Sequence, residues 1–391
     1  MIAFEDALKI VLDSAQTIQT EKLELLNTLD RILATDIFSD VNMPPFDKSA
    51  VDGFACCKND FDHKKELKII EIIPAGKCPE KEITNGFCSK IMTGAMLPKG
   101  ADCVVMIEDI EINNNKIKFI KENTALNICY LSEDICINDL VLSKGCLIQP
   151  QHIAVMASVG AWKPEVYKMP KIGVISTGDE LVEPHIKPAL SQIRNSNAWQ
   201  LLAQVQKAGG IPNYEGIAAD NKVSTYEKIS NAMQNNDIVL LTGGVSMGDF
   251  DYVPEIMKEI GINILFKSIA VQPGRPTVFG IKDDKYIFGL PGNPVSSFVQ
   301  FEMLVKPLIK KICGGQYKSS EIILTMGKDL LRKKTERKSF IPVSIMNGEI
   351  LPVDYHGSAH IHSYVYADGI ISMEKGVLSL KKGEKVNVRQ L

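Results

Sequence analysis

Three turns rich in glycine or acidic residues contain the residue types that could bind an oxyanion. They run from Gly243 to Asp251, from Gln272 to Pro276 and from Pro291 to Ser296, and each follows a strand-like apolar run. Glycines let backbone N–H groups approach a ligand closely, and the start of a following helix adds a partial positive charge that suits phosphate. The three turns therefore predict an oxyanion-binding face.

Carboxylates at strand ends and in turns are the second set of residues that could take part in chemistry. They are Asp52, Asp134, Glu180, Asp220, Asp249 and Asp251. Each could also be only a turn former, a helix cap or a solvated charge. Because carboxylates repel an anionic ligand unless a cation lies between them, their position beside phosphate-cradling turns predicts Mg²⁺ that joins protein and phosphate oxygens. No metal is expected at His356, His360 and His362, which have no companion Cys or acid at ligand spacing.

A doubly wound α/β domain at residues 170–318 is expected to position these turns. Short continuous apolar runs are typical of strands buried on both faces of a parallel sheet, which binds ligands at the carboxyl ends of its strands. The expected strands are residues 171–177, 237–242, 264–271 and 286–290. Three helices are expected. One begins at a cap formed by Asn195 or Ser196, a second covers 223–233, and a third at 294–312 closes the domain.

The N-terminal region, residues 1–169, is predicted to hold two interleaved domains. Residues 2–18 have the apolar spacing of an amphipathic helix, and short alternating runs predict a β insertion at about 52–138. A helix expected at 150–159 returns the chain toward the first helix. Residues 319–391 predict a small C-terminal β domain, so the whole chain is expected to be a multidomain α/β plus β protein.

Length, charge and cysteine usage limit the classes of protein that remain. A chain of 391 residues is too long for one ordinary core, and its formal net charge of −3 gives no sign of a nucleic-acid or membrane surface. Nine cysteines occur without paired C-x-x-C spacing, which fits free thiols in a reducing compartment. Neither a signal segment nor an apolar run of about 18 residues is present, so we expect a cytoplasmic protein.

Several short motifs follow one another in a recognisable order. They are Phe46-Asp-Lys-Ser-Ala-Val-Asp-Gly-Phe-Ala55, Ile91-Met-Thr-Gly-Ala95, Glu133-Asp-Ile135, Ser176-Thr-Gly-Asp-Glu-Leu181, Thr242-Gly-Gly-Val-Ser-Met-Gly248, Pro273-Gly-Arg-Pro276 and Leu290-Pro-Gly-Asn-Pro-Val-Ser296. This set resembles the molybdopterin molybdenumtransferases, the family of bacterial MoeA proteins and the gephyrin E domain. The resemblance implies insertion of molybdate into adenylylated molybdopterin, with AMP released and Mg²⁺ required. It also implies an elongated four-domain homodimer, with a cleft between the α/β domain of one subunit and N-terminal segments of the other.

The same resemblance implies roles for individual residues. The catalytic positions are Asp52, Thr93, Asp134, Glu180, Asp220 and Asp251, and Glu180 and Asp251 are the implied Mg²⁺ ligands. The implied substrate-binding residues are Gly243, Gly244, Ser246, Lys267, Gln272, Gly274, Arg275, Pro291, Gly292, Pro294, Ser296 and Ser363. A molybdopterin adenylyltransferase is the implied partner enzyme; neither nucleic acid nor membrane is expected as a partner.

The chain departs from the family pattern at two positions that are usually lysine. The residue before Pro273 is Gln272, and the residue four positions earlier is Ser268. Lys267 and Arg275 are the nearby cations that could substitute, although arginine and lysine differ in geometry.

Two other functions are compatible with parts of this pattern. One is a molybdopterin adenylyltransferase, which consists essentially of the α/β domain; the motifs around Asp52 and Thr93 argue against it. The other is a gephyrin-like scaffold that anchors peptides through its C-terminal domain; the chain has no long linker or second catalytic module to support this.

Overall fold

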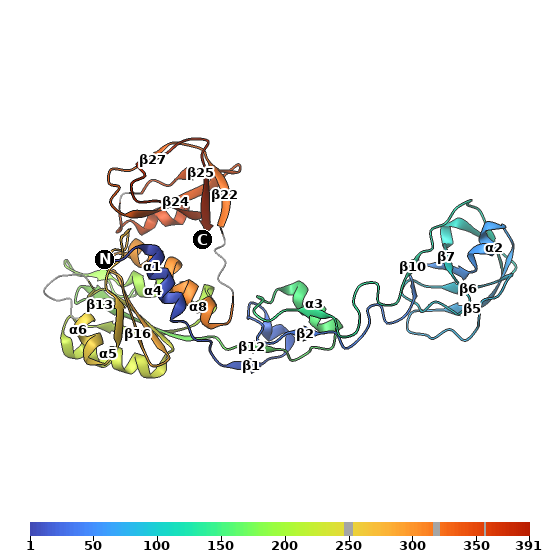
Figure 1. Ribbon diagram of the computed structural model, residues 1–391, viewed down its shortest axis with the longest axis horizontal. Helices are drawn as coiled ribbons and strands as arrows, with labels where there is room; N and C mark the ends of the chain where they lie inside the picture. The colour runs from blue at the N-terminus through green and yellow to red at the C-terminus, as the bar shows by residue number, and fades with distance from the viewer. Residues whose placement is uncertain (246–252, 316–320, 356) are drawn as a thin grey trace.

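The computed structural model describes residues 1–245, 253–315, 321–355 and 357–391. The chain is elongated (Figure 1). A small β domain lies at one end, a narrow middle region follows, and the α/β domain and the C-terminal β domain lie together at the other end. No helix among these residues has the length and apolar character needed to span a bilayer.

The α/β domain is built on a six-stranded sheet in the order β16-β13-β17-β21-β20-β18. Its strands are β13 (Lys171–Thr177), β16 (Ile211–Ala218), β17 (Ile238–Thr242), β18 (Asn263–Phe266), β20 (Val278–Lys282) and β21 (Lys285–Leu290). The first four in sheet order are parallel, whereas β20 is antiparallel to both of its neighbours. The four parallel strands therefore end at one edge, as the doubly wound pattern predicts.

Helices cover both faces of this sheet. They are α4 (Ser196–Lys207), α5 (Lys222–Asn235), α6 (Val253–Glu259), α7 (Pro294–Gln300), a π-helical segment (Phe301–Val305) and α8 (Lys306–Ile312). Along β17, Leu240 packs into the core with α4, α7 and α8, and its neighbour Leu241 packs into the core with α5 and α6. This alternation explains why the strand is an uninterrupted apolar run. Asn195 and Asn221 cap α4 and α5 by accepting hydrogen bonds from backbone N–H groups.

One expectation about the central domain is wrong. The run 264–271 is not one strand, because β18 ends at Phe266 and Val271–Gln272 forms a separate strand, β19, in the C-terminal sheet. The first helix, α1 (Phe4–Asp13), packs on the α/β domain although it belongs to the N-terminal region of the sequence. Its buried residues Phe4, Ala7 and Val11 belong to the core of the α/β domain, where α1 contacts α8 and the π-helical segment.

The N-terminal region forms a β domain and the narrow middle region. The β domain has strand order β7-β4-β6-β5-β9-β8. Its elements are β4 (Gly53–Cys56), α2 (Lys58–Asp62), β5 (Leu67–Ile73), β6 (Phe87–Ile91), β7 (Cys103–Met106), a 3₁₀ turn (Ile107–Asp109), β8 (Ile110–Asn113) and β9 (Lys116–Phe119). The short strands β3 (Lys48–Ser49) and β10 (Ile128–Cys129) lie beside the β domain, where Ile128 packs against its core (Figure 1). The middle region contains β1 (Thr20–Lys22), a 3₁₀ turn (Leu25–Thr28), β2 (Ile37–Phe38), β11 (Leu140–Leu142), α3 (Pro150–Ser158) and β12 (Glu165–Tyr167). Each small sheet here pairs an outgoing with a returning strand, so the β domain is inserted between two halves of the middle region.

The C-terminal domain is a sheet closed on itself, because β24 pairs with both β25 and β26. Its strands are β22 (Glu321–Met326), β24 (Lys338–Met346), β25 (Glu349–Pro352), β26 (Gly369–Met373) and β28 (Lys385–Gln390). Smaller elements are β23 (Leu330–Leu331), β27 (Ser379–Leu380) and a 3₁₀ segment, η4 (Ile361–Tyr366). The strand β19 joins this sheet in parallel to β24, which connects it to the α/β domain.

Candidate active site

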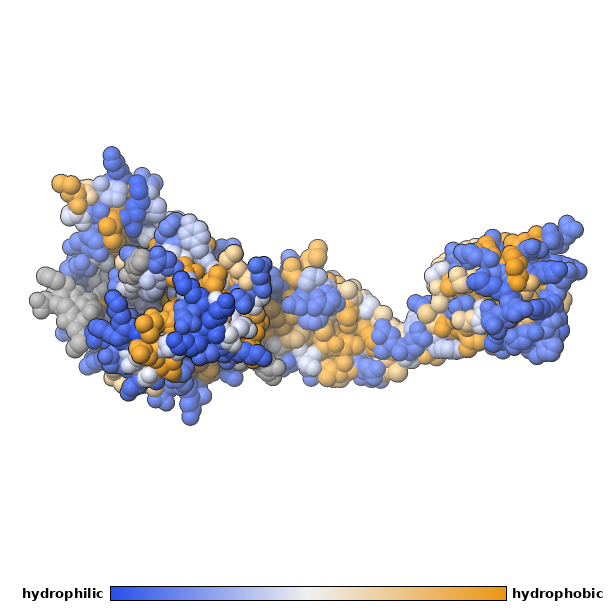
Figure 2. Space-filling model, turned by 90° about the horizontal axis from the view of Figure 1, so that it is seen from above, coloured by the Kyte–Doolittle hydropathy of each residue, from blue (hydrophilic) through white to orange (hydrophobic). Residues whose placement is uncertain are grey.

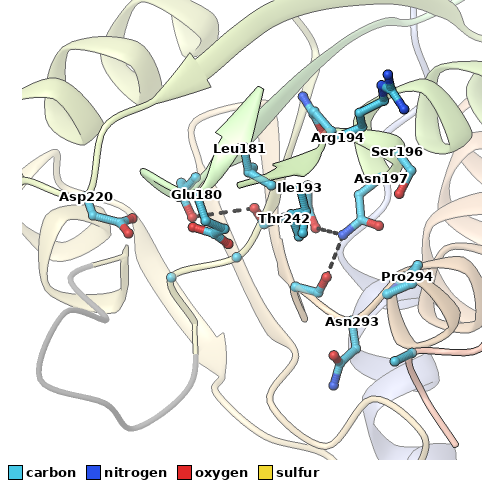
Figure 3. Close-up of a pocket in the computed structure, with 17 residues that line it drawn as sticks. Glu180, Leu181, Ile193, Arg194, Ser196, Asn197, Asp220, Thr242, Asn293 and Pro294 are labelled. Atoms are coloured by element: carbon cyan, nitrogen blue, oxygen red, sulfur yellow. Dashed lines mark hydrogen bonds between the residues drawn. The ribbon is translucent and has the colours of Figure 1, made fainter. Parts of the chain in front are cut away.

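A cavity of about 400 Å³ opens at the carboxyl ends of β13, β17 and β21 (Figure 3). Short turns after these strands line it, together with the two small strands β14 (Leu181–Val182) and β15 (Ile193–Arg194) and the start of α4. The sequence-predicted residues that line it are Glu180, Asp220, Gly243, Gly244, Gly292 and Pro294. The fold therefore brings the glycine turns and two of the predicted carboxylates together.

The turn after β17 requires glycine for both conformation and space. Gly243 has φ of +96°, and a Cβ there would lie 2.5 Å from Oγ1 of Thr177. Gly244 has φ of +66°. The N–H of Gly243 donates to the carbonyl oxygen of Leu290 at 3.1 Å, so this turn lies directly beside the turn that contains Gly292. Main-chain groups can consequently approach a ligand from two adjacent strands.

The carboxylates lie on one side of the cavity (Figure 3). Glu180 folds back over Gly178, where a Cβ would lie 2.4 Å from the glutamate Oε2. Asp220 is held by a reciprocal pair of bonds: its N–H donates to Oδ1 of Asp179 at 3.0 Å, and its Oδ2 accepts from the N–H of Asp179 at 3.3 Å. Glu180 and Asp220 therefore present oxygens to the cavity from fixed turns.

This donor set fits Mg²⁺. Carboxylate oxygens are the ligands that Mg²⁺ prefers, and it commonly uses one or two of them together with substrate phosphate oxygens. Among the described residues, no three His, Cys, Asp or Glu side chains form a complete metal site. Glu180 and Asp220 would thus hold the ion only with help from a bound substrate. The other predicted ligand, Asp251, lies outside the described residues, as does Ser246.

Asn197 is a site residue that the sequence reasoning missed. Its Nδ2 donates to Oγ1 of Thr242 at 3.0 Å and to the carbonyl oxygen of Gly292 at 2.6 Å. Oγ1 of Thr242 in turn donates to the carbonyl oxygen of Pro291 at 3.3 Å. Asn197 therefore ties the start of α4 to the turns after β17 and β21. Its position two residues after the capping asparagine was the available signal, but Asn and Ser near a helix start are ordinarily explained by capping.

Three predicted catalytic residues lie outside this cavity. Asp52 and Thr93 lie together in the β domain, at the end of the molecule opposite the α/β domain (Figure 1). Thr93 donates its N–H at 2.6 Å and its hydroxyl at 2.8 Å to Oδ1 of Asp52. These bonds lower the pKa of the Asp52 carboxyl, the backbone bond more than the side-chain bond. Asp134 lies in the middle region, where its N–H donates to the carbonyl oxygen of Met43 at 3.0 Å. Within one chain, none of the three reaches Glu180.

The Gln272–Pro276 turn is also separate from the cavity. Lys267, Gln272 and Arg275 are exposed and do not line it. Gly274 is buried against Gln300, whose Nε2 donates to the carbonyl oxygen of Pro273 at 3.1 Å. The role of this turn in substrate binding stays a prediction.

The remaining predicted residues lie behind or beside the cavity. Pro291 and Ser296 are buried beneath it and do not line it. Ser363 lines a neighbouring, mainly apolar hollow of about 830 Å³ at the C-terminal domain, which shares Ala359 with the first cavity. Its hydroxyl donates to the carbonyl oxygen of His360 at 2.7 Å.

Comparison with known proteins decides the family. Three family models match in order: the MoeA N-terminal region (domain I and II) at residues 2–160, the probable molybdopterin binding domain at 173–311 and the MoeA C-terminal region (domain IV) at 328–391. A protein of Staphylococcus aureus, named molybdopterin molybdenumtransferase, is 33% identical over 400 residues, with 99% of this chain and 95% of the relative covered. The chain belongs to the MoeA family. A relative of the same name from Staphylococcus epidermidis is also 33% identical with the same coverage.

Solved MoeA structures share the whole architecture. One from Pyrococcus horikoshii aligns with a TM-score of 0.87 at 30% identity and covers 100% of both chains. A second structure from that organism aligns with a TM-score of 0.84 at 32% identity, covering 100% of this chain and 99% of the other. The MoeA match therefore includes the β domain that contains Asp52 and Thr93 as well as the α/β domain that contains the cavity.

Proposed function

We propose that the chain is a molybdopterin molybdenumtransferase of molybdenum cofactor biosynthesis, which inserts molybdate into adenylylated molybdopterin and releases AMP. The observation that carries this proposal is the meeting of Glu180 and Asp220 with the turns of Gly243 and Gly292 in one cavity. A substrate that contains a phosphoanhydride needs both hydrogen-bond donors and charge compensation, and these residues can supply them. The relatives that span the full chain carry the same name.

The residues of the cavity have separate tasks in this reaction. Main-chain N–H groups of the two glycine turns bind the phosphate oxygens of the substrate. Glu180 and Asp220 would hold Mg²⁺, which would supply charge compensation for the phosphate that leaves with AMP. Asn197 keeps both turns at a fixed separation through its two donated hydrogen bonds. The resulting rigid cradle orients the substrate toward molybdate.

A homodimer would complete the site. Asp52 and Thr93 are remote from the cavity of their own chain, so they can take part only in the cavity of a second copy (Figure 1). The narrow middle region exposes large apolar side chains, visible as hydrophobic patches in Figure 2. Exposed large side chains of this region are Leu26 (83% exposed), Trp162 (60%), Phe38 (55%) and Leu140 (51%). Exposed apolar patches are typical of protein interfaces.

The substrate would come from a molybdopterin adenylyltransferase, and we place both enzymes in the cytoplasm. A direct assay tests the proposed function: the protein is mixed with adenylylated molybdopterin, molybdate and Mg²⁺, and AMP is measured together with reconstitution of a molybdenum-dependent apoenzyme. Molybdate-dependent AMP release with reconstitution is expected. AMP release that needs no molybdate, or the absence of both products, would contradict the proposal.

A further inference from the structure

The cavity has an unusual balance of charge for an anionic substrate. Among the described residues that line it, the carboxylates are Glu180 and Asp220 and the only cation is Arg194. Two negative charges and a phosphate-bearing ligand repel one another, and one Mg²⁺ offsets only part of that repulsion. A cation from the protein would offset more of that repulsion.

The two cations expected from the sequence do not fill this need. Lys267 and Arg275 lie outside the residues that line the cavity, and the positions where the family pattern has lysine are Ser268 and Gln272. In the described part of the chain, Arg194 is thus the one cationic residue that lines the cavity.

The backbone of Arg194 is held in place on both sides. The N–H of Ile193 donates to the carbonyl oxygen of Glu180, and the N–H of Asn195 donates to that of Val182, each at 2.8 Å. These bonds lock β15 beside β14. Figure 3 shows Arg194 at the rim next to Ser196, with its guanidinium directed outward and Glu180 and Asp220 on the opposite side of the cavity.

The guanidinium group of Arg194 is available for a ligand. Its Nε donates to the carbonyl oxygen of Ile186 at 3.2 Å. Its two terminal nitrogens make no hydrogen bond or ion pair with any residue that the structure describes, and the side chain is exposed. A guanidinium with both terminal nitrogens open matches the paired oxygens of a tetrahedral oxyanion.

We propose that Arg194 binds an oxyanion of the substrate at the rim of this cavity and replaces the positive charge that Ser268 and Gln272 do not provide. The inference rests on the proposed function for the identity of the substrate. Two oxyanions share the required chemistry, the phosphate of the adenylate and molybdate. Arg194 acts as a specificity-determining residue that increases affinity, whereas the carboxylates and glycine turns remain the catalytic cradle.

Three variants separate charge from structure. Arg194→Gln removes the charge, Arg194→Lys keeps the charge but loses the paired geometry, and Lys187→Gln removes a neighbouring exposed cation that does not line the cavity. AMP and molybdate are titrated separately by calorimetry at low and high salt, and KM and kcat are measured in the AMP-release assay. Thermal unfolding checks that all three variants remain folded.

Arg194→Gln is expected to weaken binding of either AMP or molybdate about tenfold, the effect of losing a hydrogen bond to a charged group, and to raise KM with little change in kcat. The affected ligand identifies which oxyanion Arg194 holds. Its binding should also become less sensitive to salt. The affinity of Arg194→Lys for that ligand should lie between those of the other two variants, and the affinity of Lys187→Gln should match that of the wild type.

Two results would overturn the proposal. One is unchanged binding of both ligands by Arg194→Gln. The other is an equal loss in Arg194→Gln and Arg194→Lys with unchanged salt sensitivity, which would assign Arg194 only to ordering the chain near Ile186. A wild-type protein that releases no AMP would refute the proposed function, while the calorimetric titrations would still test Arg194.

Discussion

Glu180 is exposed and makes no side-chain hydrogen bond with a described residue, so its charge in the cavity serves no packing purpose that the structure shows. Asp220 differs, because its carboxylate also accepts a hydrogen bond from the N–H of Asp179. Substituting Glu180 consequently tests metal binding with less effect on the fold than substituting Asp220.

Glu180→Ala should reduce AMP release about 100-fold or more, since a metal ion contributes several kcal/mol of charge stabilisation in such sites. The free energy of unfolding should stay within about 0.5 kcal/mol of the wild type, as for other exposed positions. Steady-state kinetics at several Mg²⁺ concentrations measure the first effect, and urea denaturation the second. Glu255→Ala, which removes an exposed carboxylate on α6, is the control. Near-normal activity of Glu180→Ala at low Mg²⁺ would rule out its role as a ligand.

The pKa of Asp52 gives a test at a residue far from the cavity. Both hydrogen bonds from Thr93 favour the charged carboxylate and lower its pKa. The stability they contribute is therefore present above the ordinary value of 3.8 and is lost as the pH falls through the lower value of the folded protein.

Thr93→Val should raise the pKa of Asp52 part of the way toward 3.8, because it removes the hydroxyl donor and leaves the backbone donor in place. NMR titration of labelled aspartate carboxyl carbons measures the shift. Thr124→Val, whose hydroxyl donates to the carbonyl oxygen of Ala125, should leave Asp52 unchanged. An unchanged pKa in Thr93→Val would mean that the hydroxyl bond is not formed in solution.

At the scale of helices and strands, the sequence predicts the elements that depend on residues close together along the chain. The strand over 171–177 and the cap at Asn195 are confirmed, because an apolar run and a capping side chain act within a few residues. The expectation for the run 264–271 is wrong, since its last part pairs with β24 of another domain and nothing in an apolar run specifies which sheet receives it. In the same way, the amphipathic pattern of α1 predicts a helix but cannot name the core on which it packs.

The candidate site shows a similar division. Gly243 and Gly244 could be predicted because a turn with positive φ requires glycine. The contacts of Asn197 could not, because they join residues about 45 and 95 positions apart along the chain. The meeting of Arg194 with the glycine turns likewise depends on the tertiary fold.

Gly243→Ala should be destabilising by more than its backbone conformation alone explains. Gly209, at the end of α4, has a similar φ of +89°, but a methyl group added there would meet no atom within 4 Å, so Gly209→Ala is the matched control. Gly209→Ala should lower the free energy of unfolding by about 1 kcal/mol. Gly243→Ala should cost about 1–3 kcal/mol more, because its Cβ would overlap Oγ1 of Thr177. Equal costs in urea denaturation would show that the turn can relax.

At the scale of the whole molecule, the elongated chain separates residues that the reaction would need together. The cavity and the Asp52–Thr93 pair lie at opposite ends of the structure (Figure 1). A second copy that packs against the exposed side chains of the middle region could bring the two into contact, and a mixing experiment can detect this.

A mixture of Asp52→Ala and Glu180→Ala proteins, each inactive alone, should regain activity after subunit exchange. A hybrid dimer has one cavity with both residues intact, so random exchange should restore about one quarter of the wild-type sites. AMP release measures recovery, and native mass spectrometry of differently tagged subunits confirms exchange. A mixture that exchanges but stays inactive would place both residues in the cavity of a single chain.

The packing of α1 on the α/β domain also affects how the nascent chain folds. This helix leaves the ribosome roughly 300 residues before its partner α8, an interval on the order of 15 to 60 s at usual rates of synthesis. During that time Phe4, Ala7 and Val11 have no core to enter, and an isolated helix of 10 residues is marginal in water. The first helix to be synthesised is therefore among the last to become stable, and until then the N-terminus is an accessible apolar segment for a chaperone.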